Sequence, residues 1–194
     1  MTKNIQFYFD LVSPYSYIAH KKIQKIEKEE NIKFIYKPIL LGGLHNLIGI
    51  TAPAFINPKA KFMIRDCKMV AKKFNIKFTF NPKFPINSLN LMRGLISISA
   101  NKKKIYIDNF YDAYWQHGLN LNEEKVIFSI LKKCKINKND FQKKIKNQKI
   151  KDKLKKLTQE AYEINIFGAP TFVVNKKIFW GQDRIDYALD EAKN

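Results

Sequence analysis

The stretch Phe9-Asp10-Leu11-Val12-Ser13-Pro14-Tyr15-Ser16-Tyr17 decides the fold, because a strand ends and a helix begins within it. Residues 5–9 form an alternating apolar run that is rich in β-branched and aromatic side chains, a pattern that predicts a strand. Serine is a favoured N-cap and proline is favoured at the first helical position, so Ser13-Pro14 predicts a helix start. Apolar residues then recur at helical spacing, and residues 32–36 predict a second strand that completes a strand–helix–strand unit.

Ser13 and Ser16 have the spacing of a Cys-x-x-Cys motif, but neither residue carries a thiol. Serine cannot form a disulfide, so this corner excludes a dithiol redox mechanism. What is left is a hydroxyl at a helix N-terminus, a place that favours a bound anion. Two interpretations follow from these residues alone: Ser13 only caps the helix, or it also holds the anionic group of a ligand.

A second informative stretch lies near the other end, at Phe167-Gly168-Ala169-Pro170-Thr171-Phe172-Val173-Val174. Its Gly-x-Pro turn opens into an apolar, β-branched run, which predicts a buried strand. Residues 178–180 predict a further short strand, and apolar spacing after Arg184 predicts a last helix. A strand–helix–strand unit followed by strand–strand–helix is thioredoxin-like architecture. In that fold a cis proline lies beside the helix corner, so we expect the Ala169–Pro170 bond to be cis.

The segment between these two stretches is mostly helical. Helices are predicted at residues 59–74, 88–100, 103–117, 123–134, 138–147 and 149–164. The expected fold class is therefore α/β, with a thioredoxin-like sheet and a large all-helical insertion. We expect a discontinuous thioredoxin-like domain at 1–58 and 166–194, a helical subdomain at 59–165, and a substrate cleft between them.

Composition limits the possible classes of protein. The 194 residues are 45% hydrophobic and 13% aromatic, which is typical of a folded domain. No apolar run approaches the roughly 18–20 residues of a membrane span, and the first strand begins too early to leave room for a signal peptide. We therefore expect a cytoplasmic protein with no membrane partner.

The formal charge of +19 raises the question of a nucleic-acid partner. Only three of the 36 basic residues are arginine, and the lysines concentrate on the polar faces of predicted helices. Arginine-rich base readers and aromatic stacking motifs are not apparent, so specific nucleic-acid binding is not expected. A more modest consequence is attraction of anionic small molecules.

The thiols and imidazoles show no reactive grouping in the sequence. Cys67 and Cys134 each continue an apolar helical stripe and are interpreted as small core residues. His20, His45 and His117 have no second ligand one helical turn away, so no metal site is predicted.

Three motifs together resemble one family: the Ser-Pro-Tyr-Ser corner, the 167–174 run, and Phe179-Trp180-Gly181-Gln182-Asp183-Arg184-Ile185-Asp186. They resemble the 2-hydroxychromene-2-carboxylate isomerases and kappa-class glutathione transferases, relatives of the DsbA-type oxidoreductases. The resemblance covers essentially the whole chain and implies a sheet of the DsbA/kappa type. It also implies a homodimer, glutathione as cofactor, and a small aromatic or electrophilic substrate.

The resemblance implies a role for each motif. Ser13 would be the catalytic residue that stabilises the glutathione thiolate without attacking carbon itself. The backbone at Ala169 and Pro170 would pair with the cysteinyl part of glutathione like an added strand. Gln182 and Asp183 would hold the γ-glutamyl end.

Other positions of the matching motifs are expected near the cofactor. Lys59 matches a lysine near the glycyl carboxylate, and Pro14, Tyr15 and Arg184 complete the expected glutathione site. One departure is Ile50 after Gly49, where many members have asparagine; the resemblance therefore leaves open one polar contact to glutathione.

Three hypotheses of function remain open. The first is a glutathione-dependent isomerase of aromatic-degradation intermediates, or a kappa-like glutathione transferase or peroxidase that uses the same thiolate. The second is a DsbA-like module without redox cysteines that binds extended peptides beside Pro170. The third is a nucleic-acid-binding protein, whose retention on DNA would depend strongly on salt.

Overall fold

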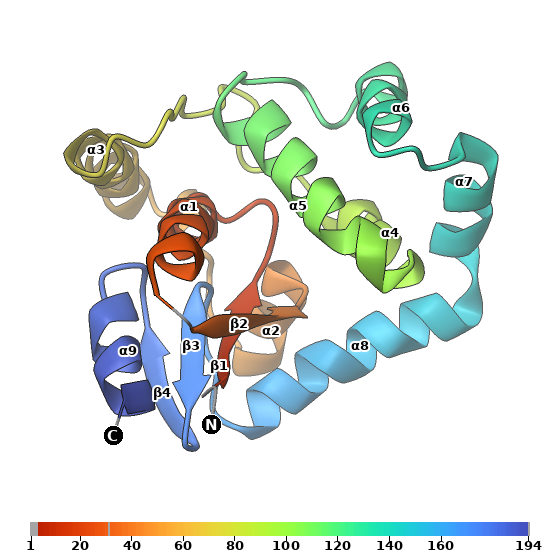
Figure 1. Ribbon diagram of the computed structural model, residues 1–194. Helices are drawn as coiled ribbons and strands as arrows, with labels where there is room; N and C mark the ends of the chain where they lie inside the picture. Colours follow the sequence, from red (N-terminus) through yellow and green to blue (C-terminus); the bar gives the residue numbers. More distant parts are fainter. Residues whose placement is uncertain (1–3, 31, 194) are drawn as a thin grey trace.

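A four-stranded mixed sheet forms the centre of the structure (Figure 1). The computed structural model describes residues 4–30 and 32–193. The elements in chain order are β1 (Asn4–Phe9), α1 (Pro14–Glu29), β2 (Lys33–Pro38), α2 (Leu41–Ile48), the 3₁₀ helix η1 (Pro53–Phe55), α3 (Asn57–Lys73), α4 (Leu89–Ser97), α5 (Ala100–Trp115), α6 (Glu124–Lys133), α7 (Lys138–Lys146), α8 (Gln148–Glu163), β3 (Thr171–Val174), β4 (Lys177–Trp180) and α9 (Ile185–Lys193).

The sheet joins the two ends of the chain, in the strand order β2-β1-β3-β4. Strand β1 is parallel to β2 and antiparallel to β3, and β3 is antiparallel to β4. Phe7 pairs with Tyr36 on one side and with Phe172 on the other. The thioredoxin-like sheet predicted from the N-terminal and C-terminal motifs is therefore confirmed.

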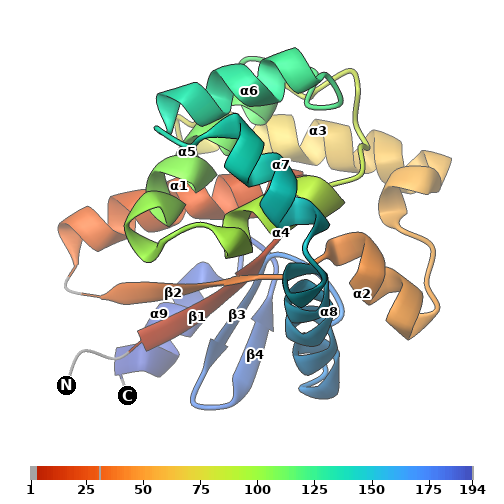
Figure 2. The same cartoon turned by 90° about the vertical axis from the view of Figure 1, so that its right-hand side faces the viewer.

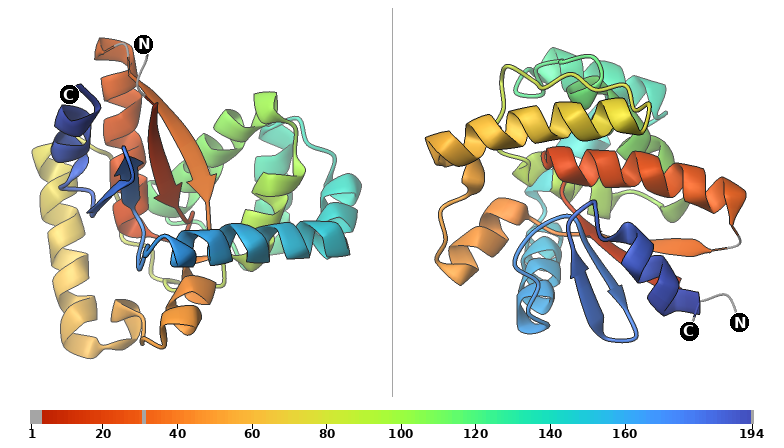
Figure 3. Two further views of the ribbon diagram at one scale, coloured as in Figure 1. Left: turned by 90° about the horizontal axis from the view of Figure 1, so that it is seen from below. Right: turned by 90° about the vertical axis from the view of Figure 1, so that its left-hand side faces the viewer.

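Alternating side chains of the strands supply two separate apolar layers. Phe7 and Phe172 are buried in the cluster that includes residues of α1 and α9; in the right-hand view of Figure 3, α9 lies in front of the strands and α1 runs above them. Tyr8 and Val173 point to the opposite face and pack with Leu44 of α2 and Ala161 of α8. The sheet is thus covered on both faces, which explains its aromatic and β-branched composition.

The helical segment packs directly onto the corner between β1 and α1. Helices α4 to α7 gather to one side of the sheet, and α8 leads the chain back to β3 (Figure 2). Tyr106 and Trp115 of α5 are fully buried in the same apolar cluster as Phe9, and the Trp115 indole N–H donates to the Leu11 carbonyl at 3.1 Å. The division into domains 1–58 with 166–194 and 59–165 stays a prediction; residues 1–3, 31 and 194 of these ranges lie outside the described residues.

Most predicted elements are confirmed within three residues at either end, but α2 was not predicted. Its sequence contains Gly42 and Gly43, which hide the helical pattern, and it ends at Gly49 in the left-handed conformation (φ 77°). None of the helices in the described part of the chain is long and apolar enough to cross a membrane.

Candidate active site

Ser13 lies at the corner between β1 and α1, as the N-cap of a 16-residue helix. Its backbone is extended (φ −80°, ψ 117°), and Pro14 occupies the first helical turn, where a missing amide hydrogen is tolerated. The Ser13 Oγ accepts a hydrogen bond from the backbone N–H of Ser16 at 3.1 Å. The predicted capping role of Ser13 is therefore confirmed.

The same hydroxyl contacts the second motif. Ser13 Oγ donates to the carbonyl oxygen of Ala169 at 2.9 Å, although the residues are 156 positions apart. The Ala169–Pro170 peptide bond is cis, as predicted. Ser13, Ala169 and Pro170 are all buried. The fold thus brings together the two stretches that the sequence singled out.

Tyr15 faces helix α3. Burial raises the pKa of the half-buried Tyr15 phenol, and the neighbouring Cys67 and Asp66 of α3 add to that shift. Cys67 is fully buried, and burial raises the pKa of its thiol as well. Burial likewise raises the pKa of Cys134 to about 11. Both thiols therefore stay protonated at neutral pH, and their assignment to the core is confirmed.

The turn between β4 and α9 carries three more of the predicted glutathione contacts. The N–H of Gly181 donates to the carbonyl of Pro170 at 2.9 Å, which places this turn beside the cis proline. Gln182 is 6% exposed, and its Oε1 has no hydrogen-bond partner among the described residues. Asp183 is exposed and pairs with Arg184 at 2.8 Å. The turn therefore contains one unpartnered buried acceptor next to one carboxylate.

One expected contributor and one departure from the family pattern lie on other segments. Lys59 is exposed on the first turn of α3, and its proximity to a ligand stays a prediction. Ile50 follows Gly49 at the end of α2 and is 44% exposed, so an apolar side chain meets solvent there.

Asp10 organises the corner, and the sequence reasoning assigned it no role. Its carboxylate is 1% exposed and accepts hydrogen bonds from Val12 N–H (2.9 Å), Leu41 N–H (2.9 Å) and the Ser88 hydroxyl (2.8 Å). Its backbone carbonyl accepts the N–H of Ser13 at 3.1 Å. Burial raises the pKa of the Asp10 carboxyl, and these hydrogen bonds oppose that shift. Asp10 thus joins the Ser13 loop to the N-termini of α2 and α4. An acidic residue inside an otherwise apolar stretch was the available signal.

His20 belongs to a buried polar cluster that the sequence pattern did not indicate either. Its Nδ1 lies 2.7 Å from the Tyr36 hydroxyl and its Nε2 lies 2.8 Å from Asp108 Oδ1, an atom that also accepts from Gln24. Burial lowers the pKa of His20, although Asp108 opposes that shift. Both ring nitrogens are occupied, so the cluster ties α1 to β2 and α5. Within residues 4–30 and 32–193, no three His, Cys, Asp or Glu side chains gather as a metal site.

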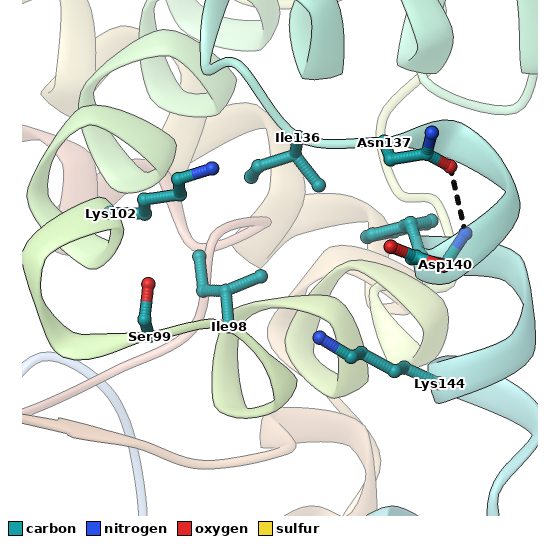
Figure 4. Close-up of a pocket in the computed structure, with 8 residues that line it drawn as sticks. Ile98, Ser99, Lys102, Ile136, Asn137, Asp140 and Lys144 are labelled. Carbon is teal, nitrogen blue, oxygen red and sulfur yellow. Dashed lines mark hydrogen bonds between the residues drawn. The ribbon is translucent and has the colours of Figure 1, made fainter.

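A cavity of about 150 Å³ lies in the helical segment, away from Ser13 (Figure 4). Isoleucine and phenylalanine side chains form its apolar wall, and Lys102 and Lys144 extend along it. None of the residues predicted for the glutathione site lines this cavity. The predicted cleft between sheet and helices stays a prediction.

Comparisons with known proteins agree with the resemblance seen in the motifs. The family model of the DSBA-like thioredoxin domain matches residues 4–192. The chain is 26% identical over 189 residues to a 2-hydroxychromene-2-carboxylate isomerase of Sphingobium xenophagum, with 96% of each protein covered. It is 26% identical over 201 residues to glutathione S-transferase kappa 1 of Caenorhabditis elegans, covering 96% of this chain and 89% of that protein.

A solved structure of a 2-hydroxychromene-2-carboxylate isomerase has the same fold. It matches with a TM-score of 0.87 at 22% identity and covers 98% of this chain and 94% of the other. The fold class predicted from the sequence is confirmed by this match and by the family model.

Proposed function

The chain belongs to the DSBA-like thioredoxin domain family, and on this premise we propose that it is a glutathione-dependent isomerase of 2-hydroxychromene-2-carboxylate-like intermediates of aromatic degradation. The observation that carries the proposal is the Ser13 hydroxyl, buried at the N-terminus of α1 in place of a redox cysteine and 2.9 Å from the Ala169 carbonyl oxygen. Full-length similarity to proteins that are named for this isomerase supports the reaction class.

The role proposed for Ser13 is to stabilise a negative charge on sulfur. When bound, glutathione would supply a thiol whose ionised form is the nucleophile. The single proton of the Ser13 hydroxyl is directed to the Ala169 carbonyl, and rotation about the C–O bond can redirect it to a sulfur anion. The Ser16 N–H still bonds Ser13 Oγ in that rotamer. A charge-assisted hydrogen bond and the positive end of helix α1 both lower the pKa of a thiol held there.

The turn before α9 fits the γ-glutamyl end of glutathione, which carries an ammonium group. Gln182 Oε1 is a buried acceptor without a partner in the described chain, and a buried unpaired acceptor is unfavourable unless a ligand satisfies it. The carboxylate of the adjacent Asp183 supplies the complementary charge. The Gly181 N–H donates a hydrogen bond to the Pro170 carbonyl. This turn therefore adjoins the Ala169–Pro170 backbone that is proposed to pair with the cysteinyl part of glutathione.

A glutathione transferase is the second candidate, because the similarity to a kappa-class transferase has the same percentage identity. The thiolate at Ser13 is common to both reactions. They differ in the product, since an isomerase releases glutathione unchanged whereas a transferase releases a conjugate. Measuring the glutathione consumed per product formed therefore separates the two.

The test is the glutathione dependence of turnover on hydroxychromene carboxylates and model electrophiles. We expect turnover of the carboxylates that requires glutathione and does not consume it. Ser13→Ala should lower the rate at saturating glutathione about 10- to 100-fold, because one charge-assisted hydrogen bond is lost. Ser16→Ala is the matched control and should change the rate much less.

Three results would point elsewhere. Consumption of glutathione with formation of a conjugate favours the transferase. Turnover that is independent of glutathione, or unchanged by Ser13→Ala, contradicts the role of Ser13. A calorimetric titration that finds no binding at millimolar glutathione favours the peptide-binding module.

The oligomeric state and the cellular location are part of the same proposal. A homodimer is proposed from the family resemblance, and light scattering that reports a 22.8 kDa monomer at working concentration would contradict it. A cytoplasmic location and a catabolic role on aromatic compounds are proposed on the same resemblance.

A further inference from the structure

Lys22 ties the turn before α9 back to helix α1. Its Nζ donates to the backbone carbonyl of Gln182 at 3.0 Å, across 160 positions of sequence. Lys22 lies on the same helix as Ser13, nine residues further along. Helix α1 therefore contacts the Ala169 backbone at its start and the Gln182 backbone near its middle.

These contacts belong to one continuous set of hydrogen bonds. Ser13 donates to the carbonyl of Ala169, Gly181 donates to the carbonyl of Pro170, and Lys22 donates to the carbonyl of Gln182. The set starts and ends on α1 and passes through both segments proposed to hold glutathione. Of the three bonds, only the one from Lys22 fixes the part of the turn that carries the Gln182 side chain.

The surroundings of Lys22 suit a fixed ammonium group. The side chain is half-buried, and Nζ lies 4.2 Å from the centroid of the Phe74 ring. Burial lowers the pKa of Lys22, as does Lys73, whereas Asp183 and Asp186 raise it. An ammonium has three N–H donors, and Lys22 forms no ion pair within 4.0 Å in the described residues. The Lys22 ammonium therefore donates to a neutral backbone carbonyl, that of Gln182, the residue before Asp183.

We propose that Lys22 is the positioning residue of the γ-glutamyl subsite. By holding the Gln182 carbonyl, it orients the turn so that Gln182 Oε1 and the Asp183 carboxylate serve one ligand ammonium. This inference rests on the proposed function, because it requires glutathione to bind along this turn. Lys22 would thus affect recognition without touching the ligand, because it contacts only the backbone of the turn.

The experiment measures the affinities of three ligands by calorimetry or competition: glutathione, γ-glutamylcysteine and cysteinylglycine. Lys22→Met should weaken binding of the first two about tenfold and leave cysteinylglycine unchanged, because only the first two carry the γ-glutamyl group. Lys22→Arg should retain affinity, since a guanidinium also donates to a carbonyl.

Lys21→Met is the matched control. Lys21 is also half-buried on α1, but its Nζ pairs with Asp112 at 2.6 Å and not with the turn. All three affinities should stay at the wild-type value in this variant. Lys22→Gln, which keeps an N–H donor without the charge, replaces Lys22→Met should the latter fail to fold, and a smaller loss with the same ligand pattern is expected.

The outcomes separate this inference from the proposed function. Wild-type affinity for glutathione in Lys22→Met overturns the inference alone, as does an equal loss for all three ligands, which indicates a general structural role. A wild-type protein that does not bind millimolar glutathione overturns the proposed function together with the inference.

Discussion

The β1–α1 corner and the turn before α9 are linked by hydrogen bonds, but they differ in how their polar groups are satisfied. At the corner, Ser13 accepts from Ser16 and donates to Ala169, and the Asp10 carboxylate accepts from three donors. At the turn, Gln182 Oε1 is buried without a partner among residues 4–30 and 32–193. The Ser13 and Asp10 side chains are thus satisfied without a ligand, although the buried Ser16 hydroxyl beside them has no partner among the described residues, and at the turn the Gln182 acceptor is open.

This difference indicates how the two regions would contribute to ligand binding. A ligand at the corner must replace the hydrogen bond from Ser13 to Ala169. The net gain in binding free energy there is therefore small and depends on the charge of the sulfur. A ligand ammonium at the turn satisfies an acceptor that the fold leaves without a partner, so this contact increases the affinity for the ligand. We therefore expect variants at the corner to affect stability and thiolate chemistry, and variants at the turn to affect recognition.

The largest effect should come from Asp10→Ala. This change leaves two backbone N–H groups and the Ser88 hydroxyl buried without their acceptor, at about 1–3 kcal/mol for each unsatisfied group. We expect a loss of about 3 kcal/mol or more in the free energy of unfolding, measured by denaturant titration. Asp10→Asn keeps one acceptor oxygen and should lose less. An Asp10→Ala protein as stable as the wild type would show that the corner does not depend on this carboxylate.

Gln182→Leu should separate stability from binding at the turn. Replacing a buried unpartnered amide with an apolar side chain of similar size should leave the ligand-free protein equally stable or stabilise it by about 1 kcal/mol. The affinity for glutathione should nevertheless fall about tenfold. Thermal unfolding and calorimetry measure the two quantities. A less stable variant that binds glutathione normally would reverse the distinction between corner and turn.

A smaller, pH-dependent effect is expected at His20, which lies on α1 beyond the corner. Burial lowers its pKa in the folded protein from the ordinary value of 6.5, so just below pH 6.5 the unfolded chain binds more protons than the folded one. Stability due to His20 is therefore complete above pH 6.5 and is lost as the pH falls toward the lowered pKa. His20→Gln should reduce the stability difference between pH 7.5 and pH 5.5. Equal pH profiles for the wild type and His20→Gln would contradict this prediction.

The sequence predicted the elements whose signals are local. The Ser13–Pro14 pair marks the start of α1, apolar spacing marks the long helices, and the Gly-x-Pro turn marks β3. The motifs at both ends were enough to predict that the sheet joins them and that Ala169–Pro170 is cis.

The sequence could not predict features that depend on distant partners. Helix α2 begins where the Leu41 N–H meets the Asp10 carboxylate, 31 residues away. His20 and Asp108 are 88 residues apart, and only the packing of α5 against α1 brings them together. The open acceptor at Gln182 is likewise visible only once its burial is known.

The central claim is that Ser13 stabilises a thiolate, and it is tested most directly by ultraviolet titration of the thiolate of bound glutathione. The complexes of the wild type, Ser13→Ala and Ser16→Ala are titrated in parallel. Loss of one charge-assisted hydrogen bond, on the order of 1.5–3 kcal/mol, should raise the thiol pKa in Ser13→Ala by about one to two units. The α1 N-terminus should still hold that pKa below the value of free glutathione, and Ser16→Ala should shift it much less. Equal pKa values in all three complexes would contradict the account.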